Sequence, residues 1–226
     1  MMFQKKCENI YIAIIGDIIN SKKIDERNRI QEKLKKILNE INYNYPNNIV
    51  SNFMITLGDE FQGLLTLGSE IFRIISFIEM EMHPIKIRFG IGIGEITTEI
   101  NRDFPLGSDG PAYYNARDMI YELKKLERKY ESYNANIMIK SDIYNSETIE
   151  LINSILTLCT TIKGKWTERQ YEIIKCYLEN DENQHLAAQS LAINQSSVNK
   201  SLNNSGFYNY WKAISNLISF LDYMEK

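Results

Sequence analysis

The feature that most constrains this chain is an alternation of two apolar patterns along most of its length. Short β-rich runs alternate with longer segments in which apolar residues recur every three or four positions, the spacing of one buried helix face. The predicted elements, in chain order, are a strand at 11–15, a helix through 30–41, a hairpin with strands 53–57 and 61–67, a helix capped by Ser69 and ended by Pro84, a strand at 85–96, a helix at 111–130, a strand at 135–139 and a helix at 146–161. This order predicts an α/β sandwich with helices packed on a mixed sheet.

The pattern changes near Lys163-Gly164-Lys165, after which only helical periodicity remains. The predicted helices are 167–179, 184–191, 195–203 and 207–224, and Ile193-Asn194 forms a short turn between the middle two. Such a pair has the geometry of a helix-turn-helix. We therefore expect two domains, an α/β domain at 1–163 and an all-α helix-turn-helix domain at 164–226.

Composition excludes several classes of protein. The chain has 226 residues, of which 44% are hydrophobic and 24% charged, as in ordinary globular proteins. Its longest apolar run, Ile10 to Ile15, is far too short to span a membrane, and the N-terminus lacks a signal-peptide pattern. The sequence thus predicts a cytoplasmic protein with no membrane partner.

Cysteine spacing and net charge narrow the classes further. The three cysteines, Cys7, Cys159 and Cys176, are odd in number and form no Cys-x-x-Cys pair, so we expect free thiols rather than disulfides or a zinc site. A net charge of −3 provides no global attraction to nucleic acid, so any DNA contact must come from a local face.

Three carboxylates are expected at one edge of the sheet. Asp17 ends a buried strand, and Asp59 and Glu60 occupy the hairpin tip. Magnesium prefers such oxygen ligands, and two ions could activate a hydroxyl and neutralise a triphosphate as pyrophosphate leaves. The alternative is that a Gly-Asp-Glu tip is an ordinary turn and that Asp17 accepts backbone hydrogen bonds.

Two other features have both a ligand-binding and a structural interpretation. The loop after Asp17 could hold phosphates through its amides and lysines, or could only cap a helix; it contains Ile18, Ile19, Asn20, Ser21, Lys22 and Lys23. Glycines alternate at Gly90, Gly92 and Gly94, which either leaves room for a base or ribose or lets another element pack closely.

The motifs Gly16-Asp17-Ile18-Ile19-Asn20-Ser21, Thr56-Leu57-Gly58-Asp59-Glu60-Phe61 and Arg88-Phe89-Gly90-Ile91-Gly92-Ile93-Gly94-Glu95 together resemble the SatD family. The resemblance covers nearly the whole chain. The core is also distantly similar to class III nucleotidyl cyclases and GGDEF-type diguanylate cyclases. These resemblances imply a ferredoxin-like, nucleotidyl cyclase-like palm domain in which Asp17 and Asp59 bind metal and Glu60 holds the next position of the tip.

The cyclase resemblance extends to the segment from Gly110 to Arg117. In class III cyclases the corresponding helix carries an Asn and an Arg four residues apart, which orient ribose and stabilise the transferred phosphate. The resemblance places Arg117 at that Arg and Tyr113 at the Asn position, with Asn115 displaced. A guanidinium can bind phosphate oxygens as a fork, although a salt bridge with a helix acid is the alternative for Arg117.

The C-terminal helices carry a candidate DNA-binding face. Ala187, Leu191, Ile193 and Val198 have the spacing of buried positions, and the residues expected to face outward and contact DNA are Gln195, Ser196, Asn199 and Lys200. Residues 167–226 contain five basic against seven acidic residues. We therefore expect weak or dimer-dependent DNA binding, with a protein-contact role as the alternative.

Taken together, the sequence predicts a metal-dependent nucleotidyl cyclase or nucleotidyltransferase that acts on a nucleoside triphosphate with Mg²⁺ or Mn²⁺. Its expected catalytic residues are Asp17, Asp59, Glu60 and Arg117, and its output is coupled to DNA through the helix-turn-helix. The resemblance to cyclases also implies a homodimer, in which Arg117 serves the partner's substrate. The alternative function is a non-catalytic, nucleotide-sensing transcriptional regulator.

Overall fold

A five-stranded mixed sheet forms the centre of the protein in a computed structural model, which describes residues 9–68, 70–130 and 135–225. The strands are β1 (Ile10–Ile18), β2 (Ile49–Leu57), β3 (Glu60–Thr66), β4 (Ile87–Glu95) and β5 (Ile137–Ser141). They lie in the order β2-β3-β1-β4-β5, with β5 parallel to β4 and the other neighbours antiparallel. The first four strands follow the β-α-β-β-α-β order of a ferredoxin-like motif. The predicted mixed α/β architecture is confirmed.

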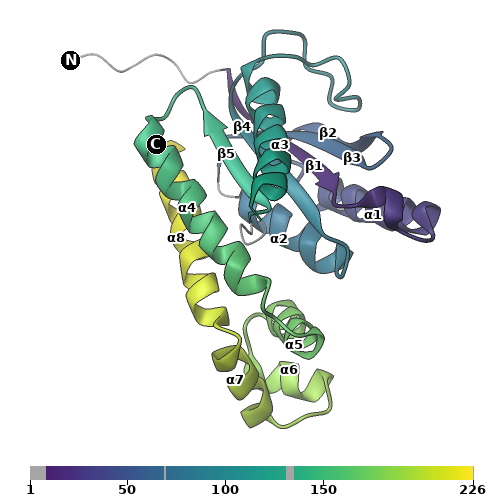
Figure 1. Cartoon of the computed structure of the whole chain (residues 1–226), viewed down its shortest axis with the longest axis vertical. Coiled ribbons are helices and arrows are strands. Elements are labelled where there is room, and N and C mark those ends of the chain that lie inside the picture. Colours follow the sequence, from purple (N-terminus) through teal and green to yellow (C-terminus); the bar gives the residue numbers. More distant parts are fainter. Residues whose placement is uncertain (1–8, 69, 131–134, 226) are drawn as a thin grey trace.

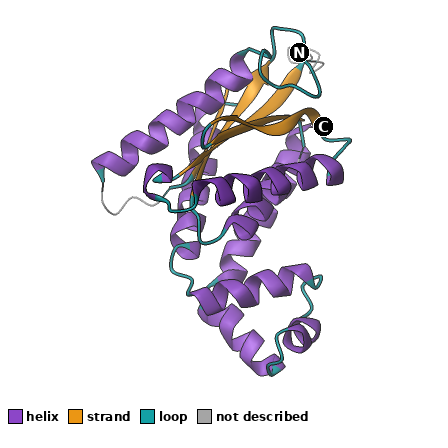
Figure 2. Ribbon diagram, turned by 90° about the vertical axis from the view of Figure 1, so that its right-hand side faces the viewer, coloured by secondary structure: helices purple, strands orange, loops and turns teal. Residues whose placement is uncertain are grey.

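Helices cover both faces of this sheet (Figures 1 and 2). The helices are α1 (Arg27–Asn44), α2 (Glu70–Met82), α3 (Pro111–Lys129), α4 (Ser146–Lys163), α5 (Glu168–Glu179), α6 (Gln184–Ser190), α7 (Gln195–Asn204) and α8 (Phe207–Glu225), with a 3-10 turn at Ser21–Lys23. Side chains alternate between faces along a strand. Accordingly Ile12 and Ile14 pack with α1, α2 and α4, whereas Ala13 and Ile15 pack with α3.

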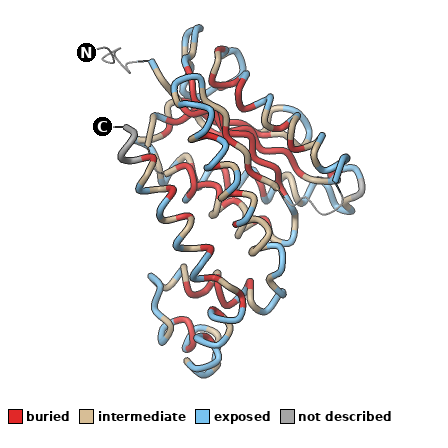
Figure 3. Tube along the Cα trace, turned by 60° about the vertical axis from the view of Figure 1, so that its left-hand side comes forward, coloured by how far each residue is buried: buried red, intermediate tan, exposed pale blue. Residues whose placement is uncertain are grey.

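The C-terminal helices share the core of the sheet domain. Helix α8 returns along α4 and also contacts α2, so a continuous buried cluster runs from the strands to Phe207 and Leu217 (Figure 3). Glu79 of α2 ties the parts together: its carboxylate accepts hydrogen bonds from Lys163 and Asn136, and its carbonyl accepts one from Tyr171.

Helices α6 and α7 are joined by a short turn, as the sequence predicts. Ala187 and Val198 are buried, and Leu191 and Ile193 are partly buried against the same core. The apolar spacing therefore identifies the inward face of this helix pair correctly.

Some boundaries differ from those predicted. Strand β1 runs on to Ile18, so Asp17 lies within the strand rather than after it. Glu60 begins β3, and the tight turn is Gly58-Asp59 with Gly58 at φ 62°. The predicted cap Ser69 lies outside the described residues.

The two cysteines that the structure describes are free thiols, as expected from their spacing. Cys159 and Cys176 are free and buried, and burial raises the pKa of the Cys159 thiol to about 11; Cys7 lies outside the described residues. In residues 9–68, 70–130 and 135–225, no helix is both long and apolar enough to cross a membrane.

Helix α3 lies directly against the alternating glycines of β4. A Cβ atom added to Gly92 would lie 1.9 Å from the carbonyl oxygen of Ala112, and one added to Gly90 would lie 2.1 Å from that of Ala116. The structure thus supports close packing at this stripe and not the space for a base or ribose, because the helix backbone already fills that face.

We predict that Gly92→Ala lowers the free energy of unfolding by about 2 kcal/mol, because an overpacked core forces rigid backbone apart. Gly94→Ala is the matched control. Its added Cβ would meet its nearest atoms at 3.0 Å, so its cost should be clearly smaller. Urea denaturation of both variants measures this difference. Equal costs would show that α3 does not rest on Gly92 as described.

Candidate functional site

A row of charged side chains crosses the sheet at the end of β1. The antiparallel register sets Asp17 opposite Glu60 of β3 and opposite Arg88 of β4. Directly paired residues project from the same face, which here is the face covered by α3. Asp17 and Glu60 therefore lie side by side at one edge of the sheet, as the sequence predicts.

Asp17 is buried and has positive partners on both carboxylate oxygens. Arg88 donates from Nη1 to Oδ2 at 2.7 Å, and Lys124 donates from Nζ to Oδ1 at 2.8 Å. The side chains of Asp17 and Arg88 are only 9% and 10% exposed, whereas that of Lys124 is 38% exposed. Arg88 also binds Glu127 of α3. The inner pair is thus fixed in the protein interior, and its outer partner Lys124 reaches solvent.

Arg117 is brought to Glu60 but not to Asp17. Its Nη1 lies 3.3 Å from Glu60 Oε1, and its side chain is 60% exposed. Two predicted catalytic residues from distant parts of the chain therefore form one exposed ion pair. Arg117 therefore forms a salt bridge, but with the hairpin acid Glu60 rather than with the helix acid that the alternative expects.

Asp59 bonds to the loop after β1 instead of the α3 face. Its Oδ2 accepts a hydrogen bond from the Ser21 hydroxyl, and its carbonyl oxygen accepts one from the Ile18 amide at 3.2 Å. Neighbouring Gly58 accepts a hydrogen bond from Gln31 of α1. The hairpin tip is therefore held against this loop.

Most of the predicted phosphate-binding loop already forms hydrogen bonds within the protein. The Ile18 amide binds Asp59, and the Ile19 amide donates to the Lys86 carbonyl oxygen at 2.8 Å. Asn20 has a left-handed backbone with φ 55°. Lys22 is exposed and still presents its charge to solvent. The amides of Ile18 and Ile19 cannot contact a phosphate here, because protein carbonyl groups occupy them.

Tyr113 and Asn115 differ in whether their polar side-chain atoms already form hydrogen bonds. Asn115 is buried and donates to the Ile93 carbonyl oxygen at 3.2 Å and to Asp142 Oδ2 at 2.8 Å, so it ties α3 to the sheet. Tyr113 is also buried, but within the described residues its hydroxyl has no hydrogen-bond partner. Burial raises the pKa of Tyr113.

The predicted cluster of three carboxylates around two metal ions is not assembled. In the described parts of the chain, no group of three or more Asp, Glu, His or Cys side chains is placed to hold a metal ion. The physical reason is that Asp17 and Glu60 are neutralised by cations, while the Asp59 carboxylate binds Ser21. Mg²⁺ often takes only one or two protein carboxylates, and Asp17 and Asp59 are neighbours through the Ile18 amide. As placed, however, the Asp17 carboxylate faces α3 and the Asp59 carboxylate faces Ser21, so the two do not fit a single divalent ion without a change of side-chain conformation.

Sequence reasoning missed Arg88, Lys124 and Glu127. Lys124 lies seven residues after Arg117, two helical turns along, so the same helix face carries both cations over the sheet edge. Arg88 lies two residues before Gly90, the first of the alternating glycines of β4. Only the strand register sets Arg88 opposite Asp17. Beside Lys124 is a surface cavity of about 380 Å³, lined by Tyr121, Lys124, Lys125, Arg128 and Lys129.

The four predicted DNA-contact residues lie on α7. Ser196, Asn199 and Lys200 are exposed, whereas Gln195 is partly buried and donates a hydrogen bond to Gln184 of α6. Three of the four side chains are thus accessible to a partner, and Gln195 instead joins the two helices.

Comparison with known proteins gives one family match. The family model described as SatD family matches residues 11–219. No curated protein matches the chain.

Solved structures with partial similarity include a bacterial light-regulated adenylyl cyclase, with 14% identity, a TM-score of 0.40, and coverage of 58% of this chain and 75% of that one. The guanylyl cyclase Cya2 shows 14% identity, a TM-score of 0.34, and coverage of 50% and 70%. A regulator of polyketide synthase expression from Bifidobacterium adolescentis shows 10% identity, a TM-score of 0.31, and coverage of 96% and 82%. At TM-scores this low, these similarities define neither activity nor substrate for this chain.

We predict that Arg88→Met destabilises the protein by about 3 kcal/mol, because it leaves the buried Asp17 carboxylate with one outer cation. Adding Asp17→Asn should recover part of that loss. Arg117→Met is the control, since its ion pair with Glu60 is exposed and should cost at most about 1 kcal/mol. Denaturant unfolding of the three variants provides the free energies. Similar losses for Arg88→Met and Arg117→Met would contradict the buried pairing.

Proposed function

This chain belongs to the SatD family, and on that premise we propose that it binds a nucleoside triphosphate beside the end of β1. The proposed activity is that of a nucleotidyl cyclase or nucleotidyltransferase that depends on Mg²⁺ or Mn²⁺. The observation that carries this proposal is the set of three cations, Arg88, Arg117 and Lys124, gathered around Asp17 and Glu60.

Two of the three cations, Arg117 and Lys124, are exposed enough to bind a polyphosphate. Arg117 and Lys124 lie on one face of α3, and the basic cavity of about 380 Å³ adjoins Lys124. Arginine and lysine form short, charge-assisted hydrogen bonds with phosphate oxygens. Tyr121 also lines this cavity and is 70% exposed, so its ring offers a surface on which a base can stack.

Each residue then has a distinct role. Lys124 pairs with Asp17 in the free protein and transfers to a phosphate when the nucleotide binds, because its side chain is long and reaches solvent. Arg88 stays in place, held between Asp17 and Glu127. Arg117 moves from Glu60 to stabilise charge on the transferred phosphate.

To hold a divalent ion, Asp17 and Asp59 would have to release Lys124 and Ser21 and turn toward one another, with Glu60 assisting. The ion would then supply positive charge to neutralise the triphosphate. At Tyr113, where the cyclase resemblance expects a ribose contact, the hydroxyl has no partner among the described residues but is buried in the packing between α3 and the sheet, so it is not accessible to a ribose as placed.

A homodimer and DNA binding complete the proposal. In a homodimer the exposed guanidinium of Arg117 would serve the second chain's substrate, as the cyclase resemblance implies, instead of the substrate bound to its own chain. Two chains would also present two α7 helices, and paired helices compensate for the weak electrostatic attraction of each. Helix α7 has Lys200 and no acidic residue, which favours contact with phosphate groups.

We predict that the protein, incubated with each nucleoside triphosphate and manganese, releases pyrophosphate and one defined product, identified by mass spectrometry. Lys124→Ala should raise KM by about tenfold, because it removes a charge-assisted phosphate contact. Lys140→Ala is the control: Lys140 also pairs with an acid of α3, Asp118, but outside the charged row. Nucleotide binding without turnover would support the sensing regulator instead, and the absence of binding would refute both functions.

We predict that Lys200→Ala weakens DNA binding and reduces the slope of log affinity against log salt by about one. Lys212→Ala is the matched control, because Lys212 is exposed on α8, outside the α6–α7 pair. Fluorescence anisotropy titrations at several salt concentrations measure both quantities. An unchanged slope for Lys200→Ala would assign these helices to protein contacts.

A further inference from the structure

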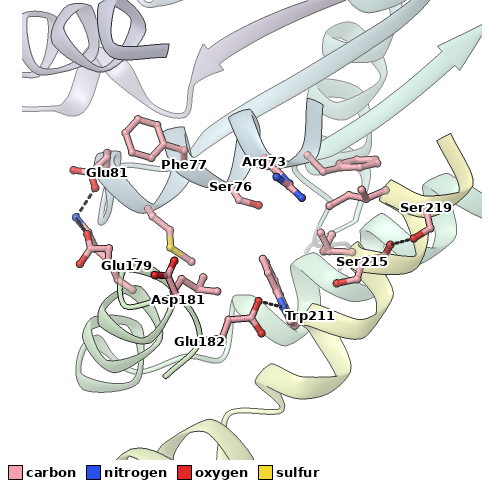
Figure 4. A pocket seen from close by; sticks show the side chains of 16 residues that line it. Arg73, Ser76, Phe77, Glu81, Glu179, Asp181, Glu182, Trp211, Ser215 and Ser219 are labelled. Atoms are coloured by element: carbon pink, nitrogen blue, oxygen red, sulfur yellow. Dashed lines mark hydrogen bonds and ion pairs between the residues drawn. The ribbon is translucent and has the colours of Figure 1, made fainter. Parts of the chain in front are cut away.

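A second cavity lies on the opposite side of the molecule from the charged row. It measures about 770 Å³ and opens between α2 of the sheet domain, the end of α5 with the turn that follows it, and α8 (Figure 4). Its walls therefore come from both sides of residue 164. None of the residues that line it belongs to the proposed nucleotide site.

The lining has the composition of a site for a small organic molecule. Ligand cavities of roughly 300 to 1,000 Å³ are mainly apolar, with a few polar groups that orient the ligand. Here Phe77 and Met80 of α2 lie across the cavity from Trp211 and Ile218 of α8. A flat apolar or aromatic body fits between such walls.

The charged groups at the cavity are mostly acidic. Four carboxylates line it, those of Glu81, Glu179, Asp181 and Glu182, against two cations, Arg73 and Lys175.

Lys175 is already shared, at 2.6 Å from Glu81 and 3.7 Å from Glu179. Trp211 donates its indole hydrogen to Glu182 at 3.0 Å, as Figure 4 shows. Asp181 has no hydrogen bond or ion pair within the described residues and is exposed. A negative charge thus remains at the turn of Asp181 and Glu182, beside an indole ring.

We propose that this cavity binds a small organic cation with an aromatic or apolar body, such as an amine. Its charge would contact Asp181 and Glu182, and the indole of Trp211 would add an attraction between the cation and its ring. Because the ligand touches α2, the 179–182 turn and α8 together, its binding stabilises the observed placement of the C-terminal helices. This binding site is separate from the nucleotide site.

Two probes with the same ring and opposite charge test this proposal. They are 2-phenylethylamine and 3-phenylpropionate, and binding is measured by saturation-transfer NMR and by the shift in melting temperature of the full chain. The amine should bind at least about tenfold more tightly, since the carboxylates attract one charge and repel the other. Equal affinities, or no detectable binding of the amine, would overturn the proposal.

Two variants, together with one control, locate the binding. Ser215→Phe places a ring inside the cavity and should abolish amine binding, whereas Asn216→Phe adds the same ring on an exposed position of α8 and should not. Asp181→Asn changes no buried contact, and asparagine tolerates the left-handed backbone at φ 53°. It should reduce the affinity for the amine severalfold even if Ser215→Phe fails to fold. Amine binding that survives both changes would refute this site, and the nucleotide assay would remain unaffected.

Discussion

The contact between α3 and the glycines of β4 brings the charged groups of α3 to those of the sheet in the candidate site. The missing side chains let the helix backbone approach until an added Cβ at Gly92 would overlap the Ala112 carbonyl oxygen. At this separation Lys124 reaches Asp17, and Arg117 reaches Glu60. A helix held further from the sheet would leave the buried Asp17 carboxylate with Arg88 alone. The close packing at the glycines therefore determines which ion pairs can form in the site.

Charge balance explains why the row is stable without a ligand. Asp17, Glu60 and Glu127 are matched by Arg88, Arg117 and Lys124, and only the pair between Asp17 and Arg88 is deeply buried. Removing charges from water costs free energy that close pairing offsets. The outer members of the row are exposed, so their pairing is weak and can be exchanged for another anion.

The sequence predicted the elements well because each has a clear period and the breaks between them carry Gly, Pro or Asn. It also predicted that Asp17 and Glu60 share a sheet edge, since strand neighbours follow from the β-α-β-β-α-β order. It did not predict that Asp59 would accept a hydrogen bond from Ser21. Nor did it predict that Arg88 and Lys124 would bond to the two carboxylate oxygens of Asp17. Those contacts depend on strand register, on side-chain direction at a two-residue turn and on the helix-to-sheet distance. None of these is visible in residue spacing.

The placement of α8 limits how the C-terminal helices can change during evolution. Many small helical units are joined to a catalytic domain by a free linker and can be exchanged between proteins without loss. Here Ile214, Leu217 and Leu221 of α8 belong to the same buried cluster as Leu156 and Cys159 of α4, and Trp166 donates a hydrogen bond to the Ser205 carbonyl oxygen across the junction. Moving residues 164–226 to another protein would leave α4 without α8 and expose the apolar residues of α4 to water. The two parts must therefore evolve together, with substitutions on α4 matched by substitutions on α8.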